Sequence, residues 1–346
     1  MALSLENLQT RRIDPDKPLL EVDDLVMHYQ IKAGVVSAVD NVGFTIHQGE
    51  AVGLVGESGC GKTSTALSLL RLLPANAEYI SGEIRLNGED LLQLSEEGMR
   101  KHRWKDIAMV FQGAMNSWNP VYRVGDQIRE VLDTHYRGEM SYDEQTEHIE
   151  QLFRAVGLPA EMIDRYPHEF SGGMRQRAVI AMALVCSPEL IIADEPTTAL
   201  DVIVQDQILR ELKRIQAEMG MSILYISHDI AVIAEVTDSL GVMYAGKLVE
   251  YGPTSEVFAR PRHPYAYLLL RSTPSITGPR RQLAPLGGEP PDLLNPPSGC
   301  RFHPRCPFAT ERCAVEEPPL EEISEGHRVA CWNYEDVPEL ETELVR

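Results

Sequence analysis

Short apolar runs that end at polar residues recur along this chain, and helical patterns separate them. These runs are Ala51–Val55, Ile107–Gln112, Leu190–Glu195 and Ser222–Ser227. Runs of this length are typical of buried strands. Because strands alternate with helices, the sequence predicts an α/β fold with a largely parallel sheet. Ligands of such sheets gather outside the carboxyl ends of the strands.

Further strands and one helical segment surround these runs. Leu19–Tyr29 predicts the start of a strand pair, Val42–Ile46 a second short strand, and Ile80–Gly88 a strand that ends at Asn-Gly. From Val124 to about Asp164 apolar residues recur at helical spacing between dense charges. We expect a partly solvated helical insertion there.

A glycine-rich stretch follows the first buried run and precedes a helical pattern. It matches G-x-x-x-x-G-K-[ST], the phosphate-loop pattern, in its required strand-to-helix context. Glycines let successive N–H groups face one concavity, and the helix start adds unpaired N–H groups. The lysine can reach the β- and γ-phosphates, and the threonine can hold Mg²⁺. The candidate nucleotide-binding residues are Gly56, Ser58, Gly59, Cys60, Gly61, Lys62, Thr63 and Ser64.

Polar side chains end the other apolar runs. Asp194 suits a Mg²⁺ ligand at a strand end, and the adjacent Glu195 can polarise an attacking water. Gln112 can reach a metal or a water beside a phosphate, and His228 can contact the γ-phosphate. Tyr29 offers a ring that can stack on a base, although a half-buried strand tyrosine is an equal alternative.

A second capped helix start, Ser171-Gly172-Gly173, precedes an apolar helix that extends to Cys186. Serine is a good N-cap, and the two glycines leave backbone N–H groups uncovered. The stretch is a second candidate phosphate-facing helix start, with a plain capped helix as the alternative.

Composition excludes some classes of function. The 346 residues carry a formal net charge of −20, which argues against broad nucleic-acid binding and against attraction to anionic lipid. No apolar run approaches the roughly 18 residues of a spanning helix, and Met1–Lys17 has no signal-peptide core. We therefore expect a cytosolic chain that reaches a membrane only through a protein partner.

Four of the six cysteines cluster near the chain end. After a linker-like stretch, Thr273–Ser298, come Cys300, Cys306, Cys313 and Cys331. Four thiols within this short span suggest one metal site. The C-x2-C knuckles usual in zinc ribbons are missing, and four thiolates also suit an iron–sulfur cluster. Cluster, zinc and no metal all remain open.

Taken together, these motifs resemble the nucleotide-binding subunit of an ABC transporter over roughly Leu19–Thr273. In this resemblance Gln112 is the Q-loop, and Asp194-Glu195 ends the Walker B strand. Ser171–Met174 forms the signature, Asp201 ends the D-loop, and His228 is the switch histidine. The resemblance implies a P-loop ATPase core with an antiparallel β subdomain and a helical subdomain.

Three further stretches resemble the oligopeptide/dipeptide importer ATPases: Phe111–Pro120, Arg262–Tyr265 and Cys300–Pro307. The resemblance implies a nucleotide-binding domain over 1–272, with a helical subdomain at about 113–186. A four-cysteine extension over 273–346 follows, and some similar ATPases carry a [4Fe–4S] cluster there. It also implies a peripheral location on the cytoplasmic face of the membrane, under two permease subunits.

In the implied mechanism, ATP lies between the phosphate loop of one subunit and the signature of a second, similar ATPase. Ser171, Gly172 and Gly173 then serve the partner's nucleotide, while Thr63, Gln112 and Asp194 are the candidate Mg²⁺ ligands. An external solute-binding protein delivers the solute, which is a peptide or alternatively an oligosaccharide or nickel. A soluble ABC-type ATPase acting on nucleic acid and a non-catalytic regulator are the competing classes.

Overall fold

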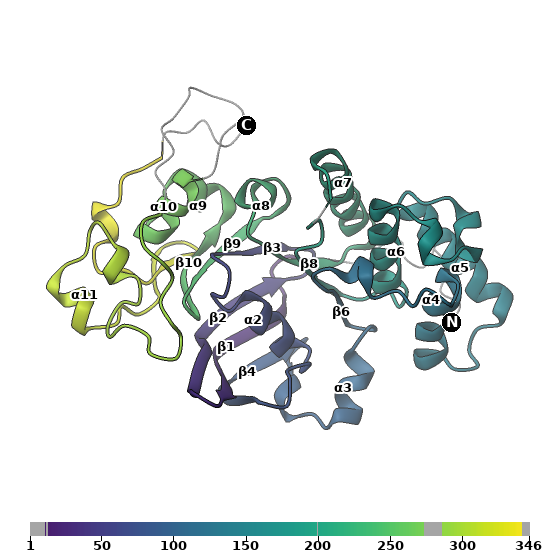
Figure 1. Cartoon of the computed structure of the whole chain (residues 1–346), viewed down its shortest axis with the longest axis horizontal. Helices are drawn as coiled ribbons and strands as arrows, with labels where there is room; N and C mark the ends of the chain where they lie inside the picture. The colour runs from purple at the N-terminus through teal and green to yellow at the C-terminus, as the bar shows by residue number, and fades with distance from the viewer. Residues whose placement is uncertain (1–10, 12, 199, 273–285, 341–346) are drawn as a thin grey trace. The chain divides into compact units, whose positions relative to one another are not determined.

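A computed structural model describes residue 11 and residues 13–198, 200–272 and 286–340 (Figure 1). Half of the predicted linker, residues 273–285, lies outside the described residues. The chain forms two compact units. The first contains Met1–Pro18, His47–Glu50 and Gln93–Tyr225; the second contains Leu19–Ile46, Ala51–Leu92 and Ile226–Arg346.

The first unit contains three neighbouring strands of a larger sheet, in the order β8-β7-β6. Their bounds are β6 Ile107–Val110, β7 Leu190–Asp194 and β8 Ser222–Ser227, and the chain leaves the unit within β8. β6 and β7 pair in parallel, and every residue of β7 and β8 is buried. The apolar runs of this unit were therefore correctly predicted as strands, and β6 and β7 as a parallel pair.

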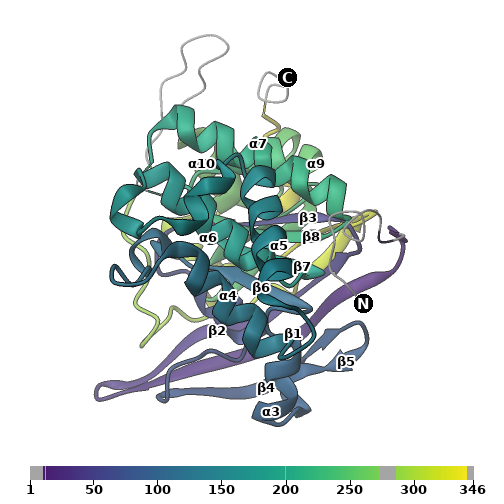
Figure 2. The ribbon, with the colours of Figure 1, turned by 90° about the vertical axis from the view of Figure 1, so that its right-hand side faces the viewer.

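Helices make up most of the rest of the first unit. They are η1 Leu91–Gln93 at its boundary, α3 Glu96–His102, η2 Ala114–Asn116, α4 Val124–His135, α5 Tyr142–Ala155, η3 Ala160–Asp164, η4 Pro167–Glu169, α6 Gly172–Leu184 and α7 Val202–Met219. The expected helical insertion is thus two α-helices and a 3-10 turn. Figure 2 shows α4, α5 and α6 gathered together, and all three helices contact one another. A capping box at Ser141 and Glu144 begins α5.

The second unit contains a four-stranded sheet in the order β2-β1-β4-β5. Its strands are β1 Pro18–Ile31, β2 Gly34–His47, β4 Ala77–Leu86 and β5 Glu89–Asp90, and β4 pairs antiparallel to both β1 and β5. β2 is longer than the predicted Val42–Ile46. Its first residues are apolar apart from Ser37, but they do not alternate with polar ones and are mostly half-buried or exposed.

This unit also contains five neighbouring strands of the larger sheet, in the order β11-β12-β10-β9-β3. Its strands are β3 Ala51–Val55, β9 Ser239–Tyr244, β10 Lys247–Pro253, β11 Glu321–Ser324 and β12 His327–Val329. β3 and β9 pair in parallel and the others antiparallel. The remaining elements are α2 Lys62–Leu69, α8 Ile230–Val236, α9 Thr254–Ala259, α10 Pro264–Ser272, η5 His303–Arg305, α11 Glu311–Val315 and η6 Tyr334–Asp336.

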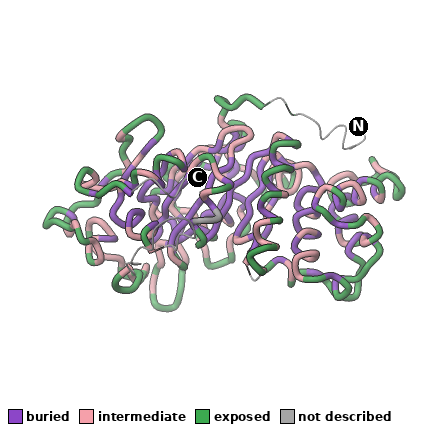
Figure 3. Tube along the Cα trace, turned by 90° about the horizontal axis from the view of Figure 1, so that it is seen from above, coloured by how far each residue is buried: buried purple, intermediate pink, exposed green. Residues whose placement is uncertain are grey.

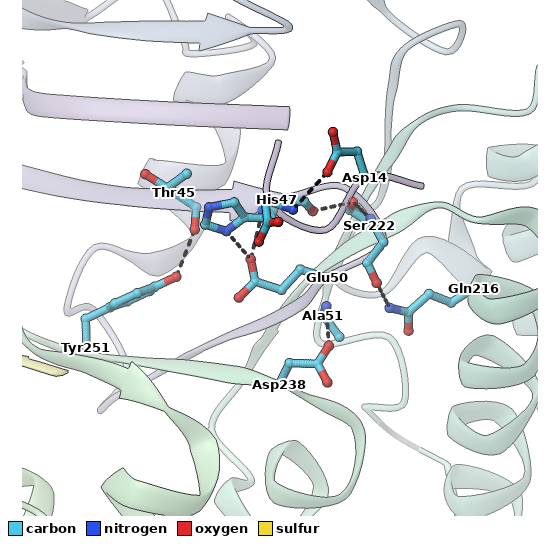
Figure 4. A network of polar contacts seen from close by, with 11 residues as sticks. Asp14, Thr45, His47, Glu50, Ala51, Gln216, Ser222, Asp238 and Tyr251 are labelled. Atoms are coloured by element: carbon cyan, nitrogen blue, oxygen red, sulfur yellow. Dashed lines mark hydrogen bonds and ion pairs between the residues drawn. The ribbon is translucent and has the colours of Figure 1, made fainter. Parts of the chain in front are cut away.

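A polar network holds the turn that leads into β3 (Figure 4). The Ser222 hydroxyl accepts from Gly49 N–H and donates to the His47 carbonyl, both at 2.9 Å. Gln216 Nε2 donates to the Gly49 carbonyl at 2.9 Å, and Glu50 Oε2 accepts from His47 N–H at 2.8 Å. The backbone immediately before the phosphate-loop strand is therefore fixed by side chains from α7 and β8.

Buried positions follow the strands, and exposed positions lie mostly on the loops and outer helix faces (Figure 3). Among the described residues, every helix is too short or too polar to span a bilayer.

Candidate nucleotide site

Two glycines of the phosphate loop admit no side chain. Gly56 has φ +152°, and a Cβ there would lie 2.2 Å from the Met243 carbonyl oxygen. Gly61 has φ +107°, and its Cβ would lie 2.3 Å from the Ala38 carbonyl oxygen. Both positions therefore combine a left-handed backbone with direct backbone contact. The loop can keep its tight path only with glycine at these two places.

Lys62 lies inside the loop. Its side chain is 7% exposed, and its Nζ donates to the carbonyls of Gly56 at 2.7 Å and Glu57 at 3.0 Å. Thr65 N–H and Oγ1 both donate to the Gly61 carbonyl, at 2.8 and 3.0 Å, and so secure the start of α2. The ammonium group is thus held at the centre of the loop backbone, where the phosphate-loop pattern requires it.

Other predicted residues of the loop differ in their exposure to solvent. Ser58, Gly59 and Thr63 are exposed, whereas Cys60 is buried. Burial raises the pKa of the Cys60 thiol, so it stays neutral at physiological pH. Tyr29, half-buried near the end of β1, lies beside the start of α2, where its hydroxyl is 3.1 Å from Ser64 Oγ.

In the first unit, Gln112 and Glu195 come together. Gln112 Nε2 donates to Glu195 Oε2 at 2.8 Å, and Thr198 Oγ1 donates to the same oxygen at 2.9 Å. Glu195 has φ +48°, an unfavourable conformation for a residue with a Cβ. Two neutral donors therefore fix one carboxylate oxygen at the end of β7.

The other strand-end residues also lie where the pattern predicts. Asp194 is the last residue of β7 and is 1% exposed. His228 directly follows β8 and is exposed. A buried carboxylate at a strand end presents the hard oxygen ligand that Mg²⁺ prefers.

Two capped helix starts carry the predicted signature and D-loop residues. Ser171 is the N-cap of α6, and its Oγ accepts from Met174 N–H at 3.3 Å, as predicted. Gly172 and Gly173 open that helix, and a Cβ on Gly173 would lie 2.8 Å from a methyl group of Val204. Asp201 caps α7 in the same way.

The four tail cysteines line one small pocket of the second unit, whose other walls include Phe302, Phe308 and Trp332. Burial raises the pKa of Cys300, raises that of Cys306 to about 11 and raises that of Cys331 to about 12. Within the described ranges, however, no three His, Cys, Asp or Glu side chains are placed to hold a metal ion. The four thiols thus line a common pocket, whereas the four-cysteine metal site stays a prediction.

Sequence reasoning missed two contacts of these motifs. Thr198 was not singled out as a donor to Glu195, although a hydroxyl three residues after a strand-end carboxylate is a detectable signal. Arg305 forms an ion pair with Glu57 of the phosphate loop at 2.7 Å. These two residues are 248 positions apart, and no local pattern connects them.

Comparison with known proteins agrees with this geometry. The family profile described as ABC transporter matches residues 39–198, and that of the oligopeptide/dipeptide transporter C-terminal region matches 249–313. A probable peptide ABC transporter ATP-binding protein of Sinorhizobium fredii is 47% identical, over 93% of this chain and 97% of that protein. The oligopeptide transport ATP-binding protein OppD of Salmonella typhimurium is 45% identical, over 95% of this chain and 98% of that protein.

Solved structures give the same fold. The dimeric structure of a bacterial ABC transporter cassette aligns with a TM-score of 0.62 and 26% identity, over 68% of this chain and 98% of that one. A dimeric post-hydrolysis state bound to ADP and Pi aligns with a TM-score of 0.61 and 26% identity, over the same shares. The chain belongs to the ABC-transporter ATPases, in the family of oligopeptide/dipeptide importer ATP-binding subunits.

Proposed function

We propose that this ATPase powers the import of di- or oligopeptides through a membrane ABC transporter. The relatives named above are peptide-transport ATP-binding proteins, and the C-terminal match covers a region particular to oligopeptide/dipeptide transporters. The contact of Gln112 and Thr198 with one oxygen of Glu195 carries the hydrolytic part of the proposal. It holds a carboxylate beside the last residue of a buried strand, which supports the proposed role of Glu195 as a general base.

In this proposal the phosphate loop and Lys62 hold the phosphates of ATP, and Tyr29 stacks on its base. Thr63, Gln112 and Asp194 are the proposed Mg²⁺ ligands, which fits the buried carboxylate of Asp194. The ion would neutralise phosphate charge. Glu195 orients and deprotonates the attacking water, and the hydrogen bonds from Gln112 and Thr198 hold its carboxylate in a fixed orientation for this role.

His228 and the signature complete the proposed site. His228 contacts the γ-phosphate, whereas Ser171, Gly172 and Gly173 face the nucleotide of a second ATPase subunit. Apolar side chains at the start of α7 support such a pairing: Val202 and Ile203 are 76% and 72% exposed. Exposed apolar side chains of this size favour burial against a partner. We propose a heterodimer with a similar ATPase.

We propose that the helical segment after Gln112 docks against two permease subunits, on the cytoplasmic face of the membrane. Val121 and Tyr122, between η2 and α4, are 70% and 58% exposed. They lie on the stretch that directly connects the Q-loop with the helical segment. A partner that covers them can therefore transmit motion to Gln112. An external solute-binding protein takes part only through the permeases.

We propose that the extension over 273–346 holds a metal through its four cysteines, either a [4Fe–4S] cluster or zinc. The thiols line one pocket, and a bound cation would offset the burial that raises their pKa values. The proposed role is structural, because a small extension has little core of its own. Metal analysis of anaerobically purified protein separates iron with acid-labile sulfide from zinc.

The test of the import function uses the chain co-expressed with its permeases and binding protein, reconstituted in vesicles. We expect ATP-dependent peptide uptake and an ATPase rate that rises with a peptide-loaded binding protein. Lys62→Ala should abolish both. Stimulation by a nickel- or oligosaccharide-loaded binding protein instead would overturn the substrate class, and stimulation by DNA without permeases would overturn the transport function.

A further inference from the structure

The segment between Cys300 and Cys306 lies against the phosphate loop in the second unit. Cys300 N–H donates to the Cys313 carbonyl at 2.8 Å, which ties the segment to the four-cysteine pocket. Arg305 is the last residue of the 3-10 turn η5, and its N–H donates to the Phe302 carbonyl at 3.0 Å. The extension thus presents two arginines of one short turn, Arg301 and Arg305, to the nucleotide-binding part of the unit.

Arg305 binds Glu57 through both terminal nitrogens of its guanidinium group. Nη1 is 2.7 Å from Glu57 Oε2, and Nη2 is 3.0 Å from Oε1. Nη1 also donates to the Tyr244 hydroxyl at 3.2 Å, and Nε donates to the Gly287 carbonyl at 2.8 Å. The Arg305 side chain is only 6% exposed. A bidentate, buried contact of this kind fixes direction as well as distance.

Glu57 is in turn connected to the phosphate-binding groups. Its N–H donates to the Tyr265 hydroxyl at 2.8 Å, and its carbonyl accepts from Cys60 N–H at 3.2 Å. The same carbonyl accepts from Lys62 Nζ at 3.0 Å. Arg305 therefore binds the side chain of the same residue, Glu57, whose backbone carbonyl positions the ammonium group of Lys62.

Aromatic packing makes the Arg305 site rigid. Phe302 is 1% exposed, and its ring packs edge-on against Tyr244 with centroids 5.1 Å apart. Tyr265 packs against both rings, at 4.6 Å from Tyr244 and 5.4 Å from Phe302. The guanidinium of Arg305 lies 5.7 Å from the Tyr244 ring centroid. Such a cluster resists rearrangement when one of its members is strained.

Arg301 provides a second connection from the same segment. Its guanidinium donates to the Ala245 carbonyl and pairs with Asp40. The next residue, Gly246, donates its N–H to the Cys60 carbonyl at 2.9 Å. The turn held by Arg301 thus supports a second point of the phosphate loop.

We propose that Arg305 is a positioning residue for ATP binding, which holds the Glu57 corner of the phosphate loop in its phosphate-receiving shape. Because Arg305 belongs to the Cys300–Cys306 segment, the C-terminal extension and the phosphate loop are mechanically coupled within the second unit. The inference rests on the proposed role of Gly56–Thr63 in phosphate binding. It adds a residue that contacts no phosphate itself and acts through Glu57.

The test compares Arg305→Ala, Arg305→Lys and Arg312→Ala in the full-length chain within its transporter complex. Arg312 is the matched control, since it also lies in the extension, pairs with Glu316 and stacks on Trp332, away from the loop. We expect Arg305→Ala to raise the Kd of a fluorescent ATP analogue about tenfold, a size typical of lost supporting contacts. Lysine should restore part of the affinity as a single-point donor, and Arg312→Ala should leave it unchanged.

Two further measurements separate positioning from general destabilisation. If Arg305 acts through Glu57, then Glu57→Gln with Arg305→Ala should have the same Kd as Glu57→Gln alone. The rate at saturating ATP should fall much less than the affinity, with a melting temperature within a few degrees of the wild type. Unchanged affinity in Arg305→Ala, or additive effects in the double variant, would overturn the inference. Failure of Lys62→Ala to weaken binding would instead contradict the proposed phosphate loop.

Discussion

Replacing Glu195 by glutamine tests the proposed chemistry most directly. The oxygen that accepts from Gln112 at 2.8 Å and from Thr198 at 2.9 Å can be replaced by the amide oxygen of glutamine. Shape and both hydrogen bonds are retained, and only the charge and the basicity are lost. We therefore expect the variant to fold normally and to bind ATP with little change in affinity.

The expected loss of turnover follows from the role of a general base. Proton transfer by a positioned side chain contributes typically about 10²- to 10⁴-fold to a rate. Removing only the Thr198 hydroxyl, by Thr198→Ala, leaves the carboxylate with one neutral hydrogen bond fewer. Such a bond contributes about 0.5–1.5 kcal/mol, so this variant should lose roughly tenfold or less. The two substitutions therefore separate the charge of Glu195 from its orientation.

The assay measures steady-state ATP hydrolysis by the transporter complex, with ATP affinity determined separately by fluorescence. Glu189→Gln is the matched control, because Glu189 directly precedes β7, whereas Glu195 directly follows it. It should leave turnover unchanged. Hydrolysis by Glu195→Gln within about fivefold of the wild type would refute the assignment of a general base.

Three further outcomes are expected. Gly61→Ala should abolish detectable ATP binding, because its Cβ would lie 2.3 Å from the Ala38 carbonyl oxygen. Gly59→Ala also carries the strain of a positive φ, +79°, but its Cβ meets no atom within 4 Å, so it should bind more nearly normally. Equal binding by the two contradicts the steric argument. Cys306→Ser should lower the metal content measured by mass spectrometry, and unchanged stoichiometric metal would exclude a four-cysteine site. Burial lowers the pKa of His263 to about 3, so its contribution to stability is complete above the unfolded pKa near 6.5 and falls as the pH decreases. Between pH 7.5 and 5.5 the protonation of His263 on unfolding should lower the free energy of unfolding by about 1.4 kcal/mol, and denaturant titrations of His263→Asn should not show this loss. An identical pH dependence in both proteins would disprove the cause.

The sequence alone was sufficient to predict strands that are buried along their whole length. β7 and β8 are buried at every residue, so their apolar runs marked them, and the polar residues at their ends gave the candidate site residues. The first half of β2 was missed although Val35, Val36, Ala38 and Val39 are apolar, because these residues do not alternate with polar ones. Ser171 was correctly predicted as an N-cap, because capping depends on only a few neighbouring residues.

Contacts between distant parts of the chain were not predictable in this way. The pairing of Glu57 with Arg305 depends on how the extension folds back within its unit. Each residue alone is an ordinary charged side chain, one in a variable position of the phosphate-loop pattern and the other between two cysteines. Only the three-dimensional arrangement identifies them as partners.

The left-handed backbone of Glu195, at φ +48°, has a consequence for protein engineering. Asparagine and glycine tolerate this conformation better, so either would relieve backbone strain of about 1 kcal/mol or more. A search for thermostable variants that scores folding alone would therefore select against the side chain to which we assign the chemistry. Libraries built on this scaffold should keep that codon fixed and seek stability elsewhere.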